Sequence, residues 1–124
     1  MIAGIGVDIV ETDRIRESVS RWGDRFLKKI FNDDEIDYCC KRKNMFQCLA
    51  ARFAAKEALI KALSGPQPGA KLPGMKDITV VNHPSGKPSI SLSGGRYDRH
   101  IINLAISHER HYAVAVVFVE TREK

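Results

Sequence analysis

The sequence has few cysteines, and their placement argues against a disulfide-stabilised fold. Cys39 and Cys40 are adjacent, and Cys48 is the third and last. An odd number of cysteines in this spacing is a poor disulfide framework, so we expect ordinary thiols in a reducing compartment, the cytoplasm. The sequence also lacks the CxxC and HxxxH spacings that would let cysteine and histidine side chains bind zinc.

Long hydrophobic runs are absent as well. No apolar stretch approaches the roughly 20 residues of a membrane-spanning helix. The first residues lack the basic segment and the cleavage site of a secretion signal, so we expect no export. With 124 residues, of which 44% are hydrophobic and 28% are charged, the chain is long enough to bury a core as a single domain over residues 1–124.

The charge of the chain is unbalanced toward the basic side. Lysines and arginines number 20 against 15 acidic residues, which gives a net charge of +5. A basic surface favours an acidic partner, which could be nucleic acid, a phosphorylated ligand or an acidic protein. Composition alone does not choose among the three.

The first half of the chain is predicted to be one strand followed by helices. Residues 2–10 alternate and are rich in β-branched side chains, as in a core strand. A helix that ends at Gly23 follows, and Asn32 with Glu35 has the pattern of a capping box that opens another helix. The expected helices cover residues 11–22, 26–31, 33–41 and 44–63, the last with one apolar stripe of Phe46, Leu49, Phe53, Ile60 and Leu63.

The second half of the chain is predicted to be rich in strands. Residues 65–74 contain three prolines and three glycines, so we expect a mobile loop there. The expected strands cover residues 77–82, 88–92, 101–106 and 112–119, with a turn at residues 84–87. The sequence therefore predicts an α+β single domain, with helices mainly in the first half packed on an antiparallel-rich sheet.

Two carboxylates fall where apolar side chains are expected. Asp8 interrupts the strand of residues 2–10, on the face that carries Gly4 and Gly6, where another backbone or a ligand can approach closely. Glu57 lies in the middle of the longest helix, at the shoulder of its apolar arc. A buried carboxylate is costly unless it is paired or binds a metal. Because the strand and the helix must pack together, one divalent cation would serve both carboxylates.

Two lysines on the same helix leave two interpretations open. Lys61 follows Glu57 by four residues, the favourable order for an ion pair on a helix, and Lys56 falls inside the apolar arc. The first interpretation is a structural salt bridge between helix and sheet. The second is a Mg²⁺ site, because two carboxylates together with substrate phosphates suit that ion and nearby lysines would contact the phosphates.

Two motifs resemble the signatures of the 4′-phosphopantetheinyl transferases. Residues 5–8 read Ile-Gly-Val-Asp, and residues 52–62 read Arg-Phe-Ala-Ala-Lys-Glu-Ala-Leu-Ile-Lys-Ala. The short chain, the Gly-Lys-Pro turn at residues 86–88 and the Ile-Ser-His segment at residues 106–108 are similar to the small bacterial holo-[acyl-carrier-protein] synthase branch. The resemblance covers essentially the whole chain and implies a 4′-phosphopantetheinyl transferase-like fold.

The resemblance implies an activity and a metal. The 4′-phosphopantetheine arm of coenzyme A would be transferred to a serine of apo acyl carrier protein, releasing adenosine 3′,5′-bisphosphate, in support of fatty acid biosynthesis. Asp8 and Glu57 would bind Mg²⁺ together with the coenzyme A pyrophosphate. Lys61 would steady the phosphate or the leaving group. Asp8 or Glu57 would take the serine proton, and the sequence does not decide which.

The resemblance also implies contacts to coenzyme A and to the carrier protein. His108 would contact the nucleotide 3′-phosphate, and Arg52 and Lys56 would meet phosphate. From the residues alone, these are equally a turn histidine, a solvated arginine and a lysine paired with an acidic neighbour. Arg14 and Arg21 on the first helix would dock the acidic carrier protein, with a solvated surface as the alternative. Small members of the family are homotrimers with active sites between subunits, and we expect the same here.

Two segments depart from the family pattern. Glycine and threonine often follow the long helix, whereas residues 64–69 are Pro-rich, so the adenine contacts do not carry over. Ala105 stands where a second serine is common. Two other functions stay open. A small basic nucleic-acid-binding protein would explain the charge, but the chain lacks an aromatic–basic sheet motif. A non-catalytic binder of carrier protein would not need the intact Asp8, Glu57 and Lys61.

Overall fold

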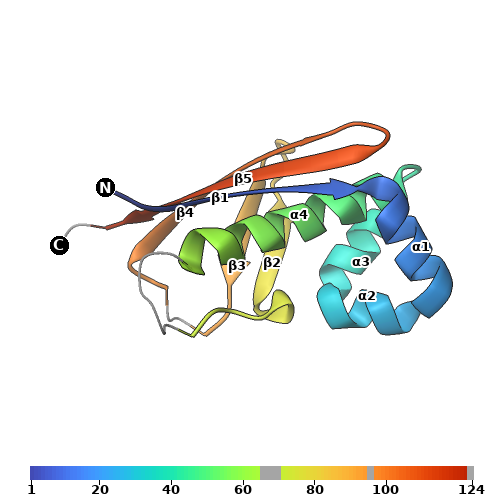
Figure 1. The fold of residues 1–124 in the computed structure, drawn as a ribbon, viewed down its shortest axis with the longest axis horizontal. Helices are drawn as coiled ribbons and strands as arrows, with labels where there is room; N and C mark the ends of the chain where they lie inside the picture. Colours follow the sequence, from blue (N-terminus) through green and yellow to red (C-terminus); the bar gives the residue numbers. More distant parts are fainter. Residues whose placement is uncertain (65–70, 95–96, 123–124) are drawn as a thin grey trace.

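Three long antiparallel strands form the main sheet of the structure, a computed structural model that describes residues 1–64, 71–94 and 97–122. The strand order is β1 (Ile2–Glu11), β5 (Tyr112–Thr121) and β4 (His100–His108). All three predicted strands are confirmed, and β4 and β5 run past their predicted ends. The two edge strands of the sheet, β1 and β4, therefore both pair with the last strand of the chain (Figure 1).

The helix α4 (Met45–Ser64) lies along one face of this sheet (Figure 1). Two glycines of β1 allow it to come close. A Cβ atom on Gly4 would lie 2.0 Å from the Ala62 carbonyl oxygen, and one on Gly6 would lie 1.9 Å from the Ala58 carbonyl oxygen. No side chain fits in that space, so glycine at both positions sets the distance between strand and helix.

The burial of α4 differs from the predicted single stripe. Leu49 and Leu63 are buried as expected, but Phe46, Phe53 and Ile60 are only partly buried. Most of the enclosed positions are alanines, namely Ala50, Ala51, Ala54, Ala55, Ala58 and Ala62. Small side chains let the helix pack directly on the sheet, since bulky ones would separate the two layers. The helix is thus enclosed on several sides rather than amphipathic.

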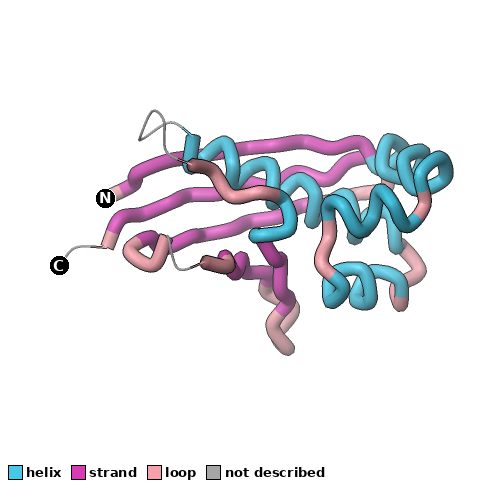
Figure 2. The backbone as a smooth tube through the Cα atoms, turned by 90° about the horizontal axis from the view of Figure 1, so that it is seen from below, coloured by secondary structure: helices cyan, strands magenta, loops and turns pink. Residues whose placement is uncertain are grey.

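Three short helices gather at one end of the main sheet (Figure 2). They are α1 (Thr12–Trp22), α2 (Asp24–Ile30) and α3 (Asp33–Cys40), close to the predicted ranges. α1 ends at Gly23, as predicted, where the backbone adopts a φ of 56° that favours glycine. The break turns the chain from α1 into α2, so the two helices are not continuous.

The predicted capping box of Asn32 and Glu35 is present at the start of α3. The Glu35 carboxylate accepts a hydrogen bond from the Asn32 backbone N–H at 2.9 Å. The Asn32 side-chain amide nitrogen also donates to Ile78 O at 3.3 Å and to Thr79 Oγ1 at 2.7 Å. Asn32 therefore ties the start of α3 to a strand far along the chain, a contact that local sequence does not reveal.

A second antiparallel sheet pairs β2 (Ile78–Asn82) with β3 (Pro88–Leu92). The short 3₁₀ helix η1 (Met75–Asp77) precedes it. The predicted turn between the strands is confirmed, with Gly86 at a φ of 91°. Of the loop predicted at residues 65–74, residues 65–70 lie outside the described part of the chain. None of the described helices is both long enough and apolar enough to cross a membrane.

A disulfide joins Cys39 and Cys48, so the expectation of three ordinary thiols was wrong. It links the end of α3 to the first turn of α4, and the two Cα atoms lie 5.5 Å apart. Cys40 is exposed and free. Adjacent residues on a helix point in directions about 100° apart, so only one of the two neighbouring cysteines can face Cys48. The packing of α3 against α4 selects the pair.

The face of the main sheet opposite α4 is apolar and exposed. Ile5 and Val7 are 58% and 55% exposed, and Ile5 lies opposite Phe118 in the register. The exposed apolar side chains on this face are Ile5, Val7, Ile9, Ile101, Tyr112 and Phe118. A contiguous apolar face of this kind usually marks an interface.

Candidate functional site

Asp8 and Lys61 form a polar contact between β1 and α4. Lys61 Nζ donates to Asp8 Oδ1 at 2.9 Å and to Val7 O at 3.2 Å. The Asp8 side chain is 17% exposed and the Lys61 side chain is 53% exposed, so the ion pair sits at the solvent edge of the packed layers. The predicted helical pair of Lys61 with Glu57 does not form. A lysine on a helix covers the turn before it, and here that turn is where β1 presents Asp8.

Glu57 lies on the turn of α4 beside this pair. Gly4 packs against Ala62 and Gly6 packs against Ala58, so β1 runs antiparallel to α4 and reaches the turn before Ala58 at Asp8. Glu57 is half-buried. Among the described residues its carboxylate has no ion pair. Because residues four apart share a helix face, Glu57 lies on the same side of α4 as Lys61, which contacts Asp8.

The donor set of this group suits a divalent cation. Within the described part of the chain, no three histidine, cysteine, aspartate or glutamate side chains lie close enough together to bind a metal on their own. A metal here would have Asp8 and Glu57 as its two protein ligands and take its other oxygen ligands from water or a substrate. Mg²⁺ is commonly bound in this way. Among the residues that the structure describes, the Glu57 carboxylate has no ion pair, which leaves its oxygen atoms free for the metal.

Lys56 has a different role from the predicted one. It is completely buried, and its ammonium donates to Glu35 Oε1 at 2.7 Å, Ile30 O at 2.8 Å and Met75 O at 3.0 Å. These bonds use all three ammonium protons. Burial lowers the pKa of Lys56, and the hydrogen bond that Lys56 donates to Glu35 opposes that shift. The predicted phosphate contact of Lys56 is therefore wrong, and the alternative of an acidic partner is confirmed.

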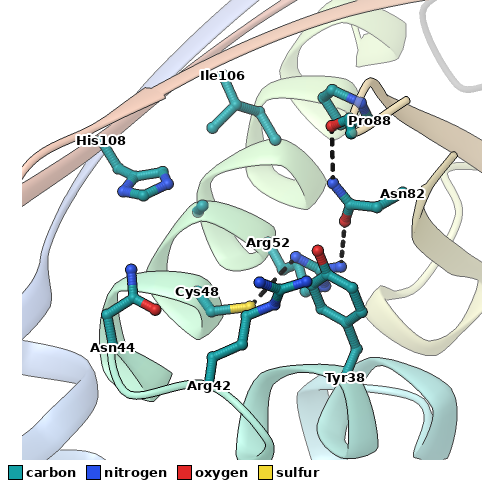
Figure 3. Close-up of a pocket in the computed structure, with 11 residues that line it drawn as sticks. Tyr38, Arg42, Asn44, Cys48, Arg52, Asn82, Pro88, Ile106 and His108 are labelled. Atoms are coloured by element: carbon teal, nitrogen blue, oxygen red, sulfur yellow. Dashed lines mark hydrogen bonds between the residues drawn. The ribbon is translucent and has the colours of Figure 1, made fainter. Parts of the chain in front are cut away.

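A second group of polar residues lines a cavity of about 370 Å³ between α3, α4, the second sheet and the end of β4 (Figure 3). Arg52 is 5% exposed there. It donates to Asn82 Oδ1 at 2.5 Å and to Cys48 Sγ at 3.5 Å, while its Nε is buried without an acceptor. Among the described residues no carboxylate lies within ion-pair distance of Arg52. A buried guanidinium without a counter-ion is a ready binding group for an anion.

The groups around Arg52 shift the pKa of its guanidinium. Burial lowers the pKa of its guanidinium, and the neighbouring Arg42 lowers it further, whereas Glu35 and Tyr38 oppose the shift. Arg42 lines the same cavity. Two positive charges thus lie close together in a partly enclosed space, which an added anion would stabilise.

His108 lines this cavity as well, so the structure brings together the two predicted phosphate contacts Arg52 and His108 (Figure 3). Within one chain the cavity lies two strands away from Asp8 in the main sheet. Ile106, another lining residue, is opposite Ala115, and Ala115 is opposite Asp8. Neighbouring strands are about 4.8 Å apart, so Asp8 and Ile106 are separated by roughly 10 Å in one chain.

Sequence reasoning missed four polar residues of the cavity, namely Tyr38, Arg42, Asn44 and Asn82. Three of them lie around the junction of α3 and α4, where the basic residues 41–43 were the only local signal. Asn82 gave none, because its contact with Arg52 joins residues 30 positions apart.

The predicted docking residues Arg14 and Arg21 are both exposed and line a hollow on α1. Trp22 lies beside them with 53% of its surface exposed. Arg16 on the same helix forms an ion pair with Asp13. In the described part of the chain Arg14 and Arg21 have no such partner, so their charges are available to an acidic surface.

Comparison with known proteins agrees with this geometry. Residues 4–117 match the family model of the 4′-phosphopantetheinyl transferase superfamily. The holo-[acyl-carrier-protein] synthase of Halothermothrix orenii is 45% identical, covering 97% of this chain and 98% of the relative. That of Thermodesulfovibrio yellowstonii is 44% identical, covering 96% of this chain and 99% of the relative.

Solved structures give the same result. A holo-(acyl-carrier-protein) synthase from Bacillus anthracis, in complex with CoA (3′,5′-ADP), superimposes with a TM-score of 0.80 at 36% identity and covers 98% of both chains. The Helicobacter pylori enzyme in complex with coenzyme A gives a TM-score of 0.79 at 36% identity, covering 94% of this chain and 99% of that one. The α+β fold predicted from the sequence is thus confirmed. The chain belongs to the holo-[acyl-carrier-protein] synthase family of the 4′-phosphopantetheinyl transferase superfamily.

Proposed function

We propose that the protein transfers the 4′-phosphopantetheine arm of coenzyme A to a serine of apo acyl carrier protein, in support of fatty acid biosynthesis. The observation that carries the proposal is the pairing of Asp8 with Lys61 beside the unpaired Glu57, since this group combines ligands for a cation with a donor for phosphate. The family membership and the coenzyme A bound to relatives of known structure support it.

In the proposed reaction, the serine oxygen attacks the phosphorus that carries the pantetheine arm, and the bond to the bridging pyrophosphate oxygen breaks. The products are holo acyl carrier protein and adenosine 3′,5′-bisphosphate. There is little covalent chemistry for the protein to do, so positioning and charge neutralisation lower the barrier. Asp8 and Glu57 would hold Mg²⁺, which when bound neutralises charge on the pyrophosphate.

The side chains around Asp8 have separate proposed roles. Lys61 would neutralise charge on the phosphate or on the departing oxygen, and its 53% exposed side chain is accessible to a ligand. Asp8 or Glu57 would accept the serine proton. Lys61 already occupies one Asp8 oxygen, whereas among the described residues the Glu57 carboxylate has no ion-pair partner. This difference favours Glu57 as the acceptor of the two.

The cavity of Arg52 and His108 is the proposed site of the nucleotide. Among the described residues no carboxylate lies within ion-pair distance of Arg52, which suits the 3′-phosphate that coenzyme A carries and dephospho-coenzyme A does not. Asn44 and Asn82 add amide groups to the same lining. A phosphate bound there would complete the charge balance of the cavity.

The exposed face of α1 is the proposed docking site for the carrier protein. Within the described part of the chain Arg14 and Arg21 form no ion pair, and an acidic helix would complement their charges. Surface charges of this kind act mainly on the association rate and on its salt dependence. Docking on α1 is therefore expected to weaken as salt is added.

We also propose a homotrimer in the cytoplasm, with active sites between subunits. The apolar outer face of the main sheet supports an assembly, because residues such as Ile5, Val7 and Phe118 would otherwise face water. In one chain Asp8 is on β1, whereas the cavity of Arg52 lies at the end of β4. The helix α4 packs over β1 and β5. A shared site would bring the carboxylates of one subunit next to the nucleotide cavity of its neighbour.

A mass measurement tests the transferase function. The protein is incubated with coenzyme A, Mg²⁺ and apo acyl carrier protein, and the intact carrier is weighed by mass spectrometry. A gain of about 340 Da, the mass of the transferred arm, is the expected result. No gain with any carrier, together with tight and salt-sensitive binding of DNA or RNA, would instead support the nucleic-acid-binding alternative.

A further inference from the structure

The ring of Tyr38 contacts two arginines in the cavity. The guanidinium carbon of Arg42 lies 4.0 Å from the ring centroid, and that of Arg52 lies 4.4 Å from it (Figure 3). The three residues come from different places in the fold, since Tyr38 is on α3, Arg42 follows α3 and Arg52 is on α4. One aromatic ring therefore brings two positive groups together.

The Glu35 carboxylate acts on the Arg52 guanidinium, but it is itself paired with Lys56. In the described part of the chain, neither Arg42 nor Arg52 forms an ion pair. Arg52 Nε is buried without an acceptor, and the other Arg52 contacts go to an amide oxygen and to a sulfur atom. Like charges held close together repel each other, so something else must keep them in place. The face of an aromatic ring attracts a cation, most strongly where water is excluded.

Tyr38 is half-buried, between two anchored residues of α3. Its neighbour Cys39 is completely buried and is bonded to Cys48 of α4. Glu35, one turn earlier on α3, accepts hydrogen bonds from Lys56 and from the Val80 backbone N–H. The segment of α3 that carries Tyr38 is thus anchored to α4 and to β2, whereas Arg42 is exposed and would move into solvent without the ring.

The ring, rather than the hydroxyl group, makes these contacts. Among the described residues the Tyr38 hydroxyl makes no hydrogen bond, while both cation–ring contacts are present. A phenylalanine at this position would keep the ring contacts, and a leucine, which is smaller and not aromatic, would lose them. Comparing the two substitutions separates the role of the ring from that of the hydroxyl group.

We propose that Tyr38 is a positioning residue that holds Arg42 and Arg52 as a paired binding site for a phosphate dianion, the 3′-phosphate of coenzyme A. The inference rests on the proposed function, and it goes further by assigning Arg42 to the site and by giving the origin of a preference for coenzyme A over dephospho-coenzyme A. Two adjacent guanidinium groups can donate several charge-assisted hydrogen bonds to one phosphate, which a single arginine cannot match.

The first experiment measures binding alone, by calorimetry without metal. Adenosine 3′,5′-bisphosphate is compared with adenosine 5′-phosphate, which lacks the 3′-phosphate, on the wild type, Tyr38→Leu, Tyr38→Phe and Arg42→Ala. Tyr38→Leu and Arg42→Ala are expected to weaken binding of the bisphosphate about tenfold and binding of the monophosphate less than about twofold. Tyr38→Phe is expected to retain the preference. Lys41→Ala removes a neighbouring charge outside the cavity and serves as the control.

The second experiment measures transfer to apo acyl carrier protein. Tyr38→Leu is expected to raise KM for coenzyme A about tenfold with little change in kcat, and to leave KM for dephospho-coenzyme A within about twofold. A merely structural role of Tyr38 would lower kcat and affect both substrates alike.

Three results would overturn the inference. The first is an equal loss of affinity for both nucleotides in Tyr38→Leu. The second is a loss of affinity for the bisphosphate in Tyr38→Phe as large as that in Tyr38→Leu. The third is unchanged bisphosphate binding in Arg42→Ala. If Tyr38→Leu does not fold, the exposed Arg42 still decides, because its substitution leaves the core intact. A chain that binds the bisphosphate selectively and transfers no arm would refute the proposed function while the role of Tyr38 stands.

Discussion

Lys61 Nζ lies 2.9 Å from Asp8 Oδ1, and this contact joins the first strand of the protein to its longest helix. The helix carries a second lysine, Lys56, which lies 2.7 Å from Glu35 Oε1. The Lys61 side chain is 53% exposed and the Lys56 side chain is 0% exposed. The two lysines of one motif therefore differ in role. A ligand can reach Lys61, whereas Lys56 stabilises the fold.

The first prediction concerns the carboxylates. Asp8→Ala and Glu57→Ala are each expected to lower the rate of Mg²⁺-dependent transfer at least about a hundredfold, because charge stabilisation at the pyrophosphate is lost. Both variants should stay folded. In Asp8→Ala the Lys61 ammonium that loses its partner can be solvated at the edge of the layers, and in Glu57→Ala the Asp8–Lys61 ion pair remains. Holo acyl carrier protein is quantified by mass spectrometry, and circular dichroism checks the fold. A near-wild-type rate in either variant would show that the metal site is misassigned.

The second prediction separates the two lysines. Lys56→Met leaves Glu35 buried without its ion-pair partner and is expected to cost about 3–5 kcal/mol of unfolding free energy. Lys61→Met removes an exposed ion pair and is expected to cost less than about 1 kcal/mol. Its transfer rate should nevertheless fall at least about tenfold. Urea unfolding and the transfer assay measure the two effects, and the assignment fails if Lys61→Met is the less stable variant and the more active one.

The third prediction concerns the close contact of β1 with α4. In Gly6→Ala the new methyl group would meet the Ala58 carbonyl oxygen at 1.9 Å. The helix must move away, so we expect a loss of about 1–3 kcal/mol or more together with weakened activity, because Glu57 moves with the helix. Gly74→Ala is the matched control, since its nearest atom would be 3.5 Å away and its φ is −81°. Equal melting temperatures for the two variants would contradict the prediction.

The fourth prediction concerns the disulfide. In denaturant without reductant, iodoacetamide should label Cys40 alone, and after reduction it should label all three cysteines. Cys39→Ser is expected to lower the free energy of unfolding by about 2–4 kcal/mol. Cys40→Ser, at the neighbouring exposed position, is the control and should change little. Labelling of three cysteines before reduction, in protein purified under oxidising conditions, would refute the bond.

The fifth prediction concerns the assembly. Val7→Glu places a charge in the centre of the apolar outer face, where its neighbour in the register is Val116. Burying an unpaired charge is costly, so we expect the trimer to dissociate into monomers and the transfer rate to fall. Val81→Glu alters another exposed valine, on the second sheet, and should leave the oligomer intact. Light scattering after gel filtration gives the mass, and a wild-type protein that is already monomeric would contradict the proposed trimer.

Local patterns predicted most of the elements, for physical reasons that are themselves local. The helix end at Gly23 needs a backbone with positive φ, which glycine adopts at low cost. The strand that contains Asp8 follows from its alternation of β-branched residues. Both depend on residues close in sequence, so the sequence sufficed.

Predictions that depended on partners distant in sequence were less secure. The spacing of Lys61 and Glu57 favoured a pair four residues apart as one of two interpretations, but Lys61 pairs with Asp8 from another element. Cys39 and Cys48 are 9 residues apart and were expected to be free thiols. In both cases the outcome depends on how two elements pack, which spacing along the chain does not contain.

The sequence by itself determined the elements, the family resemblance and the residues Asp8 and Glu57, because local propensity and a carboxylate in an apolar segment can both be read without a partner. Only the tertiary structure decided which lysine supports the fold, which cysteines pair, and that Tyr38 holds Arg42 beside Arg52. Each of these depends on the direction in which side chains point once helices and sheet have packed, and that direction is set by contacts between residues far apart in the chain.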